Sequence, residues 1–373
     1  MKKRIVVIGA GILGASTAYQ LSKKNVEVVI VDRKDNGQAT DAAAGIVCPW
    51  LSQRRNQAWY QLAKAGARFY PTLIQELEKH GETDTGYAQV GALSLHKDKE
   101  KLTKLKERAM KRQLDAPELG EILQLSKEET QALFPLLDQE YESVHVGGAA
   151  RVDGRALRDA LLRTAQKNGA KFIIGDAKIL YNDKQVTGVR IGNDPLKADM
   201  VVVCAGAWAD QLLKPMGIHF KIRFQKAQIV HLGLQETDTN HWPVLIPPGR
   251  QYLLAFENGR IVIGATHEDM EEFDTRVTLG GLQEVINTAI ETSPGITEGT
   301  FIEARTGFRP FTPGFLPVIG PIPNWKGLVV ANGLGASGLT MGPYIGSELA
   351  KLANGEEVEI DLNLYSVQGA LEE

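Results

Sequence analysis

A strand–glycine–helix–strand pattern at the N-terminus constrains the fold more than any other feature of this sequence. Apolar runs at residues 4–8 and 26–31 flank a helix-like segment at 13–24, and the second run leads into Asp32. Short β-branched runs next to glycine are typical of buried strands. The pattern therefore predicts a βαβ unit of about 30 residues.

Gly9, Gly11 and Gly14 form a GxGxxG string at the turn into the helix. The tight turn requires Gly9, close approach of the backbone to a pyrophosphate requires Gly11, and close packing of helix on strand requires Gly14. The helix N-terminus offers N–H groups and partial positive charge to phosphates. Asp32, about 20 residues after Gly11, is placed to bind the adenosine ribose. The unit predicts a dinucleotide site, and leaves open whether the dinucleotide is a nicotinamide or a flavin.

A second GxGxxG string, Gly333, Gly335 and Gly338, lies in a later strand–glycine–helix segment. We expect Pro343 in the first turn of that helix, where its missing N–H has no intrahelical partner to lose. The segment after the helix, NGEEVEIDLN, is not a buried strand ending on an acid, so a second nucleotide site is not predicted. We expect this helix N-terminus to face the other end of the same cofactor and to stabilise a reduced, anionic ring, which favours a flavin. A plain structural helix entry is the alternative.

Composition excludes several classes of function. The 373 residues are 43% hydrophobic, with a net charge of -3 and a pI near 6.2, which argues against nucleic acid as a partner. No apolar stretch reaches the roughly 20 residues of a membrane span, and the N-terminal run ends in a glycine turn instead of a signal-peptide cleavage site. Cys48 and Cys204 lie far apart and the histidines are scattered, so neither a disulfide nor a metal site is expected. We expect a cytoplasmic protein that acts on small molecules.

Two kinds of sheet are expected along the chain. Helical periodicity at 54–80 and 152–168, with apolar runs after the second segment, extends the N-terminal unit. The basic segment 97–113 is interpreted as a solvated helix with a narrow buried stripe, with a membrane or nucleic-acid surface as the alternative. Residues 215–305 contain alternating runs such as QYLLAF and RIVIGAT, which are typical of an antiparallel sheet. The predicted fold class is α/β, α+β overall, with a second domain inserted into the first.

Five segments carry a specific resemblance to a known family. They are, in chain order, VVIGAGILGASTAYQLSKKNVEVVIVDR, ATDAAAGIV, VVVCAGAWAD, TGFRPFTPGFLPVIG and GLVVANGLGASGLTMGP. The chain resembles the D-amino-acid oxidase superfamily of flavoproteins, and within it the bacterial branch of glycine oxidase, monomeric sarcosine oxidase and D-amino-acid dehydrogenase. The resemblance implies a Rossmann-like FAD-binding domain of the glutathione-reductase type over 1–85, 146–214 and 306–373. It implies an antiparallel-sheet substrate-binding domain over 86–145 and 215–305.

The resemblance also implies which residues contact FAD. At the glycine turn and the pyrophosphate they are Gly9, Gly11, Ile12, Leu13 and Gly14, and at the adenosine they are Asp32, Arg33 and, through its backbone, Lys178. Those beside the pyrophosphate and the flavin are Thr40, Ala44, Gly45 and Ile46, with Ala205, Gly206 and Trp208 on a second nucleotide-side turn. The loop that caps the pyrimidine side of the flavin contains Gly333, Leu334, Gly335, Ala336, Ser337, Gly338, Leu339 and Thr340.

At the substrate end, the resemblance aligns Arg309 with an arginine that holds the substrate carboxylate. A guanidinium pairs with both carboxylate oxygens and stays charged, although the sequence alone leaves a structural ion pair as the alternative. Tyr252 falls where glycine oxidases place a tyrosine that supports the same carboxylate, and core packing is its alternative. Trp242 and Phe224 are candidates for the pocket wall, with core packing favoured.

Three departures from the family pattern affect the expected chemistry. Ala336 stands where glycine oxidase has a basic residue, so one substrate contact is missing. Val262 lies near the position of the lysine with which sarcosine oxidases activate oxygen. The segment from Pro313 to Gly320 lacks the cysteine that bonds the flavin in those enzymes. We therefore expect non-covalent FAD.

The reaction implied is oxidation of a small amino acid or secondary amine of the glycine, sarcosine, proline or D-amino-acid type. Hydride passes from Cα to flavin N5, and the imine hydrolyses to an oxo acid and ammonia or an amine. O2 is the expected acceptor, giving H2O2, and a dehydrogenase that reduces a quinone or another carrier is the alternative. A nicotinamide-dependent enzyme or a non-catalytic nucleotide-binding module is a third hypothesis. Whether the chain forms a homo-oligomer stays open.

Overall fold

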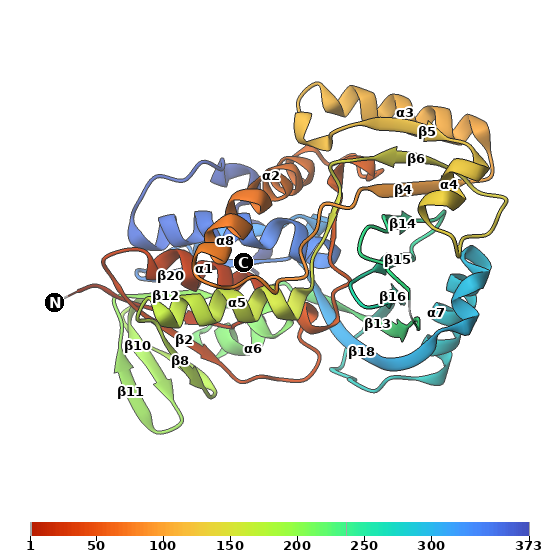
Figure 1. Cartoon of the computed structure of the whole chain (residues 1–373). Helices are drawn as coiled ribbons and strands as arrows, with labels where there is room; N and C mark the ends of the chain where they lie inside the picture. The colour runs from red at the N-terminus through yellow and green to blue at the C-terminus, as the bar shows by residue number, and fades with distance from the viewer. Residues whose placement is uncertain (1, 236, 373) are drawn as a thin grey trace.

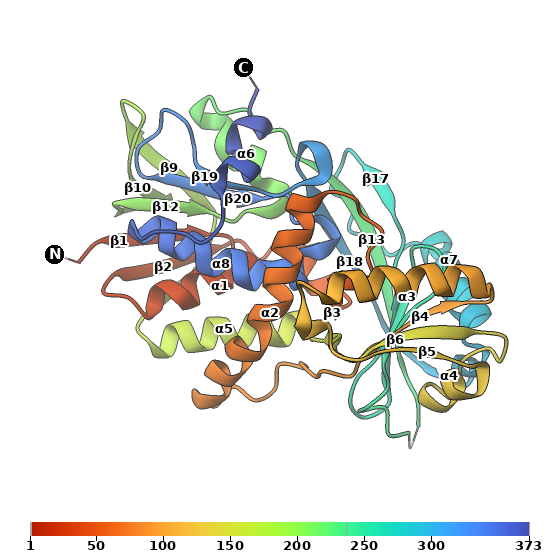
Figure 2. The ribbon, with the colours of Figure 1, turned by 90° about the horizontal axis from the view of Figure 1, so that it is seen from above.

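The structure, a computed structural model that describes residues 2–235 and 237–372, is built around two large sheets (Figure 1; Figure 2). The first sheet has six strands in the order β19-β20-β12-β1-β2-β8. All neighbouring pairs are parallel except β19 with β20. Its strands are β1 (Arg4–Ile8), β2 (Glu27–Asp32), β8 (Lys171–Ile174), β12 (Met200–Val203), β19 (Val318–Pro321) and β20 (Leu328–Asn332).

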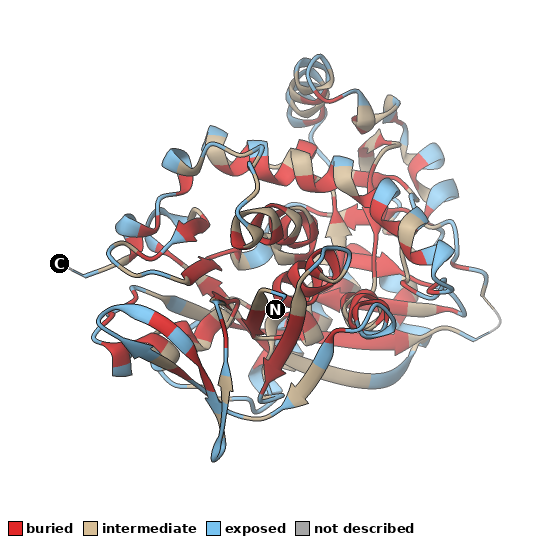
Figure 3. Cartoon of the chain, turned by 90° about the vertical axis from the view of Figure 1, so that its left-hand side faces the viewer, coloured by how far each residue is buried: buried red, intermediate tan, exposed pale blue. Residues whose placement is uncertain are grey.

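Both faces of the six-stranded sheet are buried because side chains alternate along each strand. In β1, Ile5 and Val7 pack with the helices on one face, whereas Val6 and Ile8 join a second core on the other. The helices of the first face are α1 (Ile12–Ser22), α2 (Gln57–Lys79), α5 (Gly154–Lys167) and α8 (Gly338–Asn354). The second face is covered by α6 (Ala209–Leu213) and by the three-stranded antiparallel sheet of β9 (Ala177–Asn182), β10 (Gln185–Ile191) and β11 (Asp194–Lys197). Figure 3 shows the contrast between the buried strands and the more exposed small sheet.

The second large sheet has nine strands, and one end of it carries the candidate substrate residues. Its strands are β4 (Ala92–His96), β5 (Ile122–Leu125), β6 (Glu142–Val146), β13 (Arg223–Gly233), β14 (Val244–Ile246), β15 (Tyr252–Ala255), β16 (Arg260–Gly264), β17 (Glu268–Met270) and β18 (Thr300–Phe311). The pairs are antiparallel apart from β14 with β4. Its helices are α3 (Lys99–Gln113), α4 (Lys127–Leu133) and α7 (Leu279–Thr292). A two-stranded pairing of β3 (Ile46–Val47) with β7 (Ala150–Arg151) completes the sheets.

The helices predicted from periodicity are present. The predicted segments 13–24, 54–80, 97–113 and 152–168 are α1, α2, α3 and α5, with ends shifted by up to three residues. In α3 only Leu102 and Ala109 are buried, which confirms the narrow apolar stripe of a solvated helix. Among the described residues, no helix is both long and apolar enough to span a bilayer, and no cluster of metal-ligating side chains occurs.

The predicted position of Pro343 is wrong. Because α8 already begins at Gly338, Pro343 lies beyond the first turn, inside the helix. A proline there leaves the carbonyl of the residue four positions earlier without its usual donor. That carbonyl belongs to Leu339, and the hydroxyl of Tyr70 in α2 donates to it at 2.6 Å. A neighbouring helix thus satisfies the group that the proline leaves open, which local sequence rules do not capture.

Candidate functional site

Two adjoining cavities lie at the carboxyl edge of the six-stranded sheet, where open α/β sheets bind ligands. The long cavity, of about 640 Å³, is lined by the turns that follow β1, β2, β8 and β12 and by the loop before α8. The side cavity, of about 330 Å³, is lined in part by residues of the nine-stranded sheet. The two share Ile12, Ala39, Thr40, Gly335 and Gly338, so they adjoin at the starts of α1 and α8.

The three glycines of the first motif have different surroundings. Gly9 has a φ of +101°, and a Cβ on it would lie 2.3 Å from the carbonyl oxygen of Cys204. A Cβ on Gly14 would lie 1.9 Å from the carbonyl oxygen of Gly9. By contrast, a Cβ on Gly11 meets only the Thr40 hydroxyl, at 3.3 Å, and Gly11 lines the long cavity. The fold therefore requires Gly9 and Gly14, whereas at Gly11 no backbone atom stands in the way of a Cβ.

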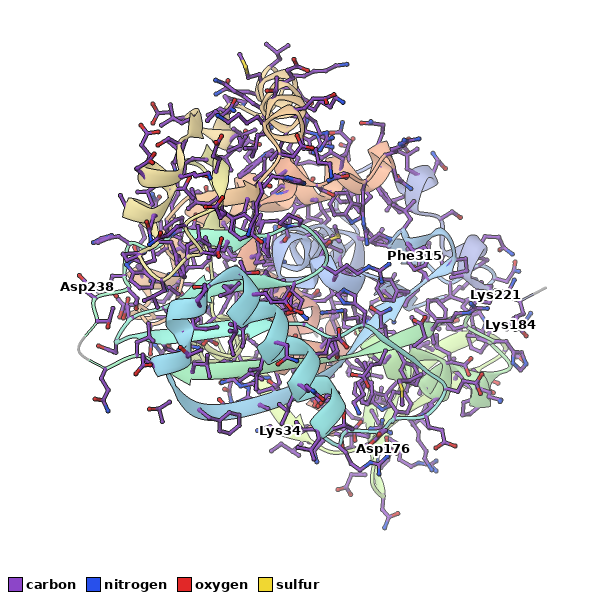
Figure 4. The ribbon with its side chains drawn as sticks, turned by 90° about the vertical axis from the view of Figure 1, so that its right-hand side faces the viewer. Lys34, Asp176, Lys184, Lys221, Asp238 and Phe315 are labelled. Atoms are coloured by element: carbon purple, nitrogen blue, oxygen red, sulfur yellow. The ribbon has the colours of Figure 1, made fainter. Side chains whose placement is uncertain are left out.

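Asp32 ends β2 at one end of the long cavity and is only 7% exposed. Its carboxylate accepts hydrogen bonds from the backbone N–H groups of Ala10 at 2.6 Å and Lys34 at 2.5 Å, and from Nε2 of Gln38 at 2.9 Å. A carboxylate has about four acceptor positions, so one is left for a ligand hydroxyl. Figure 4 labels Lys34 and Asp176 at the lower edge of the molecule, and Asp176 also lines this cavity.

The first turn of α1 and the start of α8 are held against the cavity by threonines. The N-cap residue Gly11 has no side chain, and the N–H of Ile12 donates to Oγ1 of Thr40 at 2.9 Å. In the first turn of α8, Oγ1 of Thr340 donates to the carbonyl of Ile46 at 2.9 Å. Two helix N-termini therefore lie at the adjoining cavities, and their partial positive charge favours an anionic ligand.

The structure brings together nearly all the residues predicted to contact the cofactor. Those that line the long cavity are Gly9, Gly11, Ile12, Leu13, Asp32, Arg33, Thr40, Lys178, Ala205, Gly206, Trp208, Leu334, Gly335 and Gly338. Those that line the side cavity include Ala44, Gly45, Ile46, Ala336, Ser337, Leu339 and Thr340. Gly14 and Gly333 line neither cavity; at Gly333 a Cβ would lie 1.9 Å from Oγ1 of Thr312. Both of these glycines are explained by close packing.

Arg309 and Tyr252 meet in the side cavity although they come from different strands, β18 and β15. Nη1 of Arg309 donates to Oε1 of Gln225 at 3.4 Å and to the carbonyl of Thr266 at 3.3 Å. These partners are neutral, and the part of the chain that the structure describes gives this guanidinium no ion pair. Burial raises the pKa of Tyr252, and the adjacent Arg309 guanidinium opposes that rise, so the hydroxyl stays protonated as a donor at neutral pH.

His267 is a side-cavity residue that sequence reasoning missed. Burial lowers its pKa to about 4, and the positive charges of Arg309 and Arg250 lower it in the same direction. The imidazole is therefore neutral near pH 7. It therefore adds no positive charge to the side cavity at that pH.

Two arginines of the side cavity were also missed, Arg54 and Arg250. Arg250 comes two residues before Tyr252, and the alternating run around Tyr252 would place residues at that spacing on one face if the strand extended that far; in the structure β15 begins only at Tyr252. This spacing is a signal that the sequence contained. Arg54 lies in the loop before α2 and only the folded chain brings it to the cavity.

Several residues named from the sequence lie away from both cavities. Trp242 packs on the buried Phe134 with ring centroids 4.6 Å apart, which confirms its favoured core packing. Phe224 stacks on Phe273 at 4.3 Å, and both rings are only partly buried, so Phe224 belongs to an aromatic cluster outside the main cores. Val262 is 1% exposed and belongs to the main hydrophobic core. No lysine therefore stands at that position of β16.

Comparisons with known proteins agree with this geometry. The family model described as "FAD dependent oxidoreductase" matches residues 4–352. The chain is 59% identical to the uncharacterized oxidoreductase YurR of Bacillus subtilis, over 99% of this chain and all of that protein. It is 29% identical to a glycine oxidase of Pseudomonas aeruginosa over the full length of both.

Among solved structures, the chain is similar to an iminodiacetate oxidase, IdaA, from Chelativorans sp. BNC1. The TM-score is 0.95 at 43% identity, and the match covers 97% of this chain and 98% of that one. The predicted fold class, a Rossmann-like domain with an antiparallel-sheet domain, is confirmed.

Proposed function

Because the chain belongs to the family of FAD-dependent oxidoreductases, we propose that it oxidises the carbon–nitrogen bond of a small amino acid or secondary amine whose carboxylate is held by Arg309. The observation that carries this proposal is a guanidinium with only neutral partners, in a cavity that adjoins the long cavity. A partly buried charge without a counter-ion is costly, and a substrate carboxylate would supply the missing partner. The similarity to glycine oxidase and iminodiacetate oxidase supports a substrate of this kind.

The two adjoining cavities fit FAD, bound non-covalently. Gly11 leaves room for a pyrophosphate against the start of α1, and Asp32 keeps an acceptor position for a ribose hydroxyl. Cys204 lines the long cavity and Cys48 the side cavity, and burial raises the pKa of each thiol to about 12. A protonated thiol is a poor nucleophile, which supports reversible binding. When bound, FAD supplies a ring that accepts a hydride equivalent from the substrate carbon.

The protein's own contribution to the reaction is orientation. The planar fork of Arg309 fixes both carboxylate oxygens, and the Tyr252 hydroxyl donates to the same group. The neutral His267 leaves the site without a competing acid. The neutral amine supplies the electron pair that drives hydride departure, so no side-chain base is required. The imine product then hydrolyses in water to an oxo acid and ammonia or an amine.

The reductive half-reaction tests this proposal directly. Purified holoenzyme is mixed without oxygen with glycine, sarcosine, proline, iminodiacetate and both enantiomers of common amino acids, and the flavin absorbance is followed. We expect bleaching by at least one of these amines. Dithionite serves as the control that the bound flavin can be reduced. Bleaching by dithionite and by none of the amines would rule the proposal out.

O2 is the proposed electron acceptor, and the alternative is a quinone or another carrier. The buried Val262, at the place of the oxygen-activating lysine, is the observation that favours the alternative. Peroxide formed in equal amount to oxidised substrate supports the oxidase. Slow reoxidation of the reduced flavin by air, together with fast reoxidation by a soluble quinone, supports the dehydrogenase.

A further inference from the structure

The side cavity holds more positive charge than one carboxylate can balance. Three guanidinium groups line it, those of Arg54, Arg250 and Arg309. No aspartate or glutamate is found among the described residues that line it, and the imidazole of His267 is neutral near pH 7. A substrate with one carboxylate pairs with Arg309 and leaves two cationic groups without a counter-ion. Charges gathered in a concave site without counter-ions are typical of an anion-binding site.

Arg54 is held in position by its neighbours. Its guanidinium lies over the ring of the buried Trp59, with the guanidinium carbon 4.8 Å from the ring centroid. Its backbone N–H donates to Oγ of Ser52 at 3.2 Å. Nη1 of Arg112 donates to the carbonyls of Trp50 and Ser52, each at 2.7 Å, and so ties this loop to α3. A side chain stacked in this way is pre-organised and loses little freedom when it binds a ligand.

The partial burial of Arg54 makes a bound anion energetically favourable. It is half-buried, and burial lowers the pKa of its guanidinium. It forms no ion pair within residues 2–235 and 237–372. A bound carboxylate would offset the cost of desolvation, whereas water alone does so only from the exposed side.

Arg250 approaches the same space from the nine-stranded sheet. It ends the loop before β15, two residues from Tyr252, and is exposed. Its charge and that of Arg309 both lower the pKa of His267, so both guanidinium groups are near enough to that imidazole to act on it electrostatically. An exposed arginine here can meet the outer end of a ligand whose inner end is bound by Arg309.

We propose that the substrate is an amino dicarboxylate, whose first carboxylate binds Arg309 and whose second binds Arg54 and Arg250. This inference rests on the proposed oxidation of an amino acid or amine. The second carboxylate can stand on the nitrogen substituent, as in iminodiacetate, or on the side chain of Cα, as in aspartate and glutamate. The loop before α8 contributes the uncharged Ala336 to this cavity, at the position where the resemblance expects a basic residue. The positive charge of the cavity therefore comes from the three arginines on other elements.

Matched pairs of substrates test the substrate class. Anaerobic flavin reduction at low concentration is compared for iminodiacetate against sarcosine, and for each enantiomer of aspartate against the same enantiomer of alanine. We expect the dicarboxylate of one pair to be favoured about 100-fold or more. The pair that shows the preference identifies where the second carboxylate stands. Equal rates within every pair that reacts would overturn the inference and leave the proposed function intact. No reaction in any pair would also overturn the inference, and the proposed function falls with it only if none of the amines tested above reduces the flavin.

Substitutions of Arg54 and Arg250 test whether these two residues bind the second carboxylate. Arg54→Gln and Arg250→Gln should each lower the efficiency with the dicarboxylate by about 10- to 100-fold and change that with the monocarboxylate by less than about threefold. Arg54→Lys should recover part of the loss because it keeps the charge. Arg55→Gln is the matched control, since Arg55 is the exposed neighbour on the same loop and lines neither cavity. Equal losses with both substrates would contradict the assignment.

A binding measurement separates recognition from turnover. Two sulfur compounds without an oxidisable amine are titrated into the holoenzyme: thiodiacetate and its monocarboxylate counterpart, (methylthio)acetate. The flavin difference spectrum reports their binding. We expect thiodiacetate to bind the wild type more tightly and to lose that advantage in Arg54→Gln. Flavin content and melting temperature of each variant are measured in parallel to show that the fold is intact. Equal affinities for the two compounds in the wild type would refute a subsite for a carboxylate on the nitrogen substituent.

Discussion

Arg309 combines a fixed charge with neutral partners, and this makes its removal informative. A charge-assisted pair is worth roughly 2–5 kcal/mol when one partner is cut away. We therefore expect Arg309→Ala to lower kcat/KM by about 30- to several-thousand-fold. Arg309→Lys should retain part of the activity because it keeps the charge and loses the fork. Flavin content should stay normal, since Arg309 is expected to face the substrate and the residues expected to hold the adenosine line the long cavity. Wild-type kinetics of flavin reduction in Arg309→Ala would place the carboxylate anchor elsewhere.

His231 predicts a pH dependence of stability. The side chain is buried, and both ring nitrogens lack hydrogen-bond partners among the described residues. Burial lowers the pKa of this imidazole to about 4. The positive charges of Arg305 and Arg260 act in the same direction, and the negative charges of Glu303 and Asp153 oppose them. The unfolded chain takes up this proton near pH 6.5, so stability is lost as the pH falls from 6.5 towards 4.

We expect the free energy of unfolding to fall by about 1–2 kcal/mol between pH 7 and pH 5 through this residue. Urea unfolding of the wild type and of His231→Leu at the two pH values measures the effect. The free energy of unfolding of the variant should depend less steeply on pH. Part of the pH dependence that is left should come from His267, whose pKa is also about 4. The same slope in both proteins would show that His231 is not responsible.

At the scale of elements, the glycine turn predicts a contrast between two alanine variants. Gly11→Ala adds a methyl group that only contacts the Thr40 hydroxyl, so the chain should fold and lose the approach of its backbone to pyrophosphate. Gly14→Ala places the methyl group against the backbone of Gly9, so the β1–α1 packing itself should fail. We expect colourless, folded protein in the first case and unstable protein in the second, as judged by visible absorbance and circular dichroism. Full flavin occupancy in Gly11→Ala would contradict the cofactor assignment.

The contact between α2 and α8 predicts a coupling between Tyr70 and Pro343. Tyr70→Phe leaves the buried carbonyl of Leu339 without a donor and should cost about 1–3 kcal/mol of stability. In a Pro343→Ala background, an N–H at position 343 can donate to that carbonyl, so the same Tyr70→Phe change should cost less. A double-mutant cycle in urea measures the coupling. Additive effects would show that the hydroxyl does not replace the helical donor.

The glycine turn between β1 and α1 and the contact between α2 and α8 show which elements the sequence could predict and which it could not. The β1–α1–β2 unit was predictable because apolar period, glycine turn and Asp32 act within about 30 residues of chain. The helix start at Gly338 was not, because a 3-10 turn over Gly335–Ser337 precedes it and Tyr70, far away in the sequence, makes the internal proline tolerable. Long-range partners of single groups leave no local signature.

At the scale of the whole molecule, the site is built where two sheets meet. Arg309 and Tyr252 come from the nine-stranded sheet, whereas Thr40 and Gly338 follow elements of the six-stranded one. The resemblance to a family could name these residues, but composition and periodicity could not bring them together. Arg54 was missed altogether, since its place in the side cavity depends on the packing of a loop against α3.

Filling of the long cavity predicts a stability that depends on cofactor concentration. Free FAD at about a hundred times its Kd adds about 2.7 kcal/mol to the folded state. We expect the melting temperature of flavin-depleted protein to rise with added FAD, and less with adenosine diphosphate, which fills only part of the cavity. If the flavin is held non-covalently, denaturation should release it through an ultrafiltration membrane. A melting temperature that does not respond to FAD, or flavin retained with the denatured chain, would contradict this.

The unequal surroundings of Gly9, Gly11 and Gly14 bear on how diverged relatives are interpreted. Two of the three motif positions are fixed by backbone contacts within the fold, so selection for a folded chain alone preserves them. A descendant that had lost its cofactor, a pseudoenzyme, would keep Gly9 and Gly14 for that reason. Its Gly11 would be less constrained, because a Cβ there meets only the Thr40 hydroxyl, at 3.3 Å, and no backbone atom. Gly11 is therefore the position of the motif that distinguishes an active flavoenzyme from an inactive copy of its scaffold.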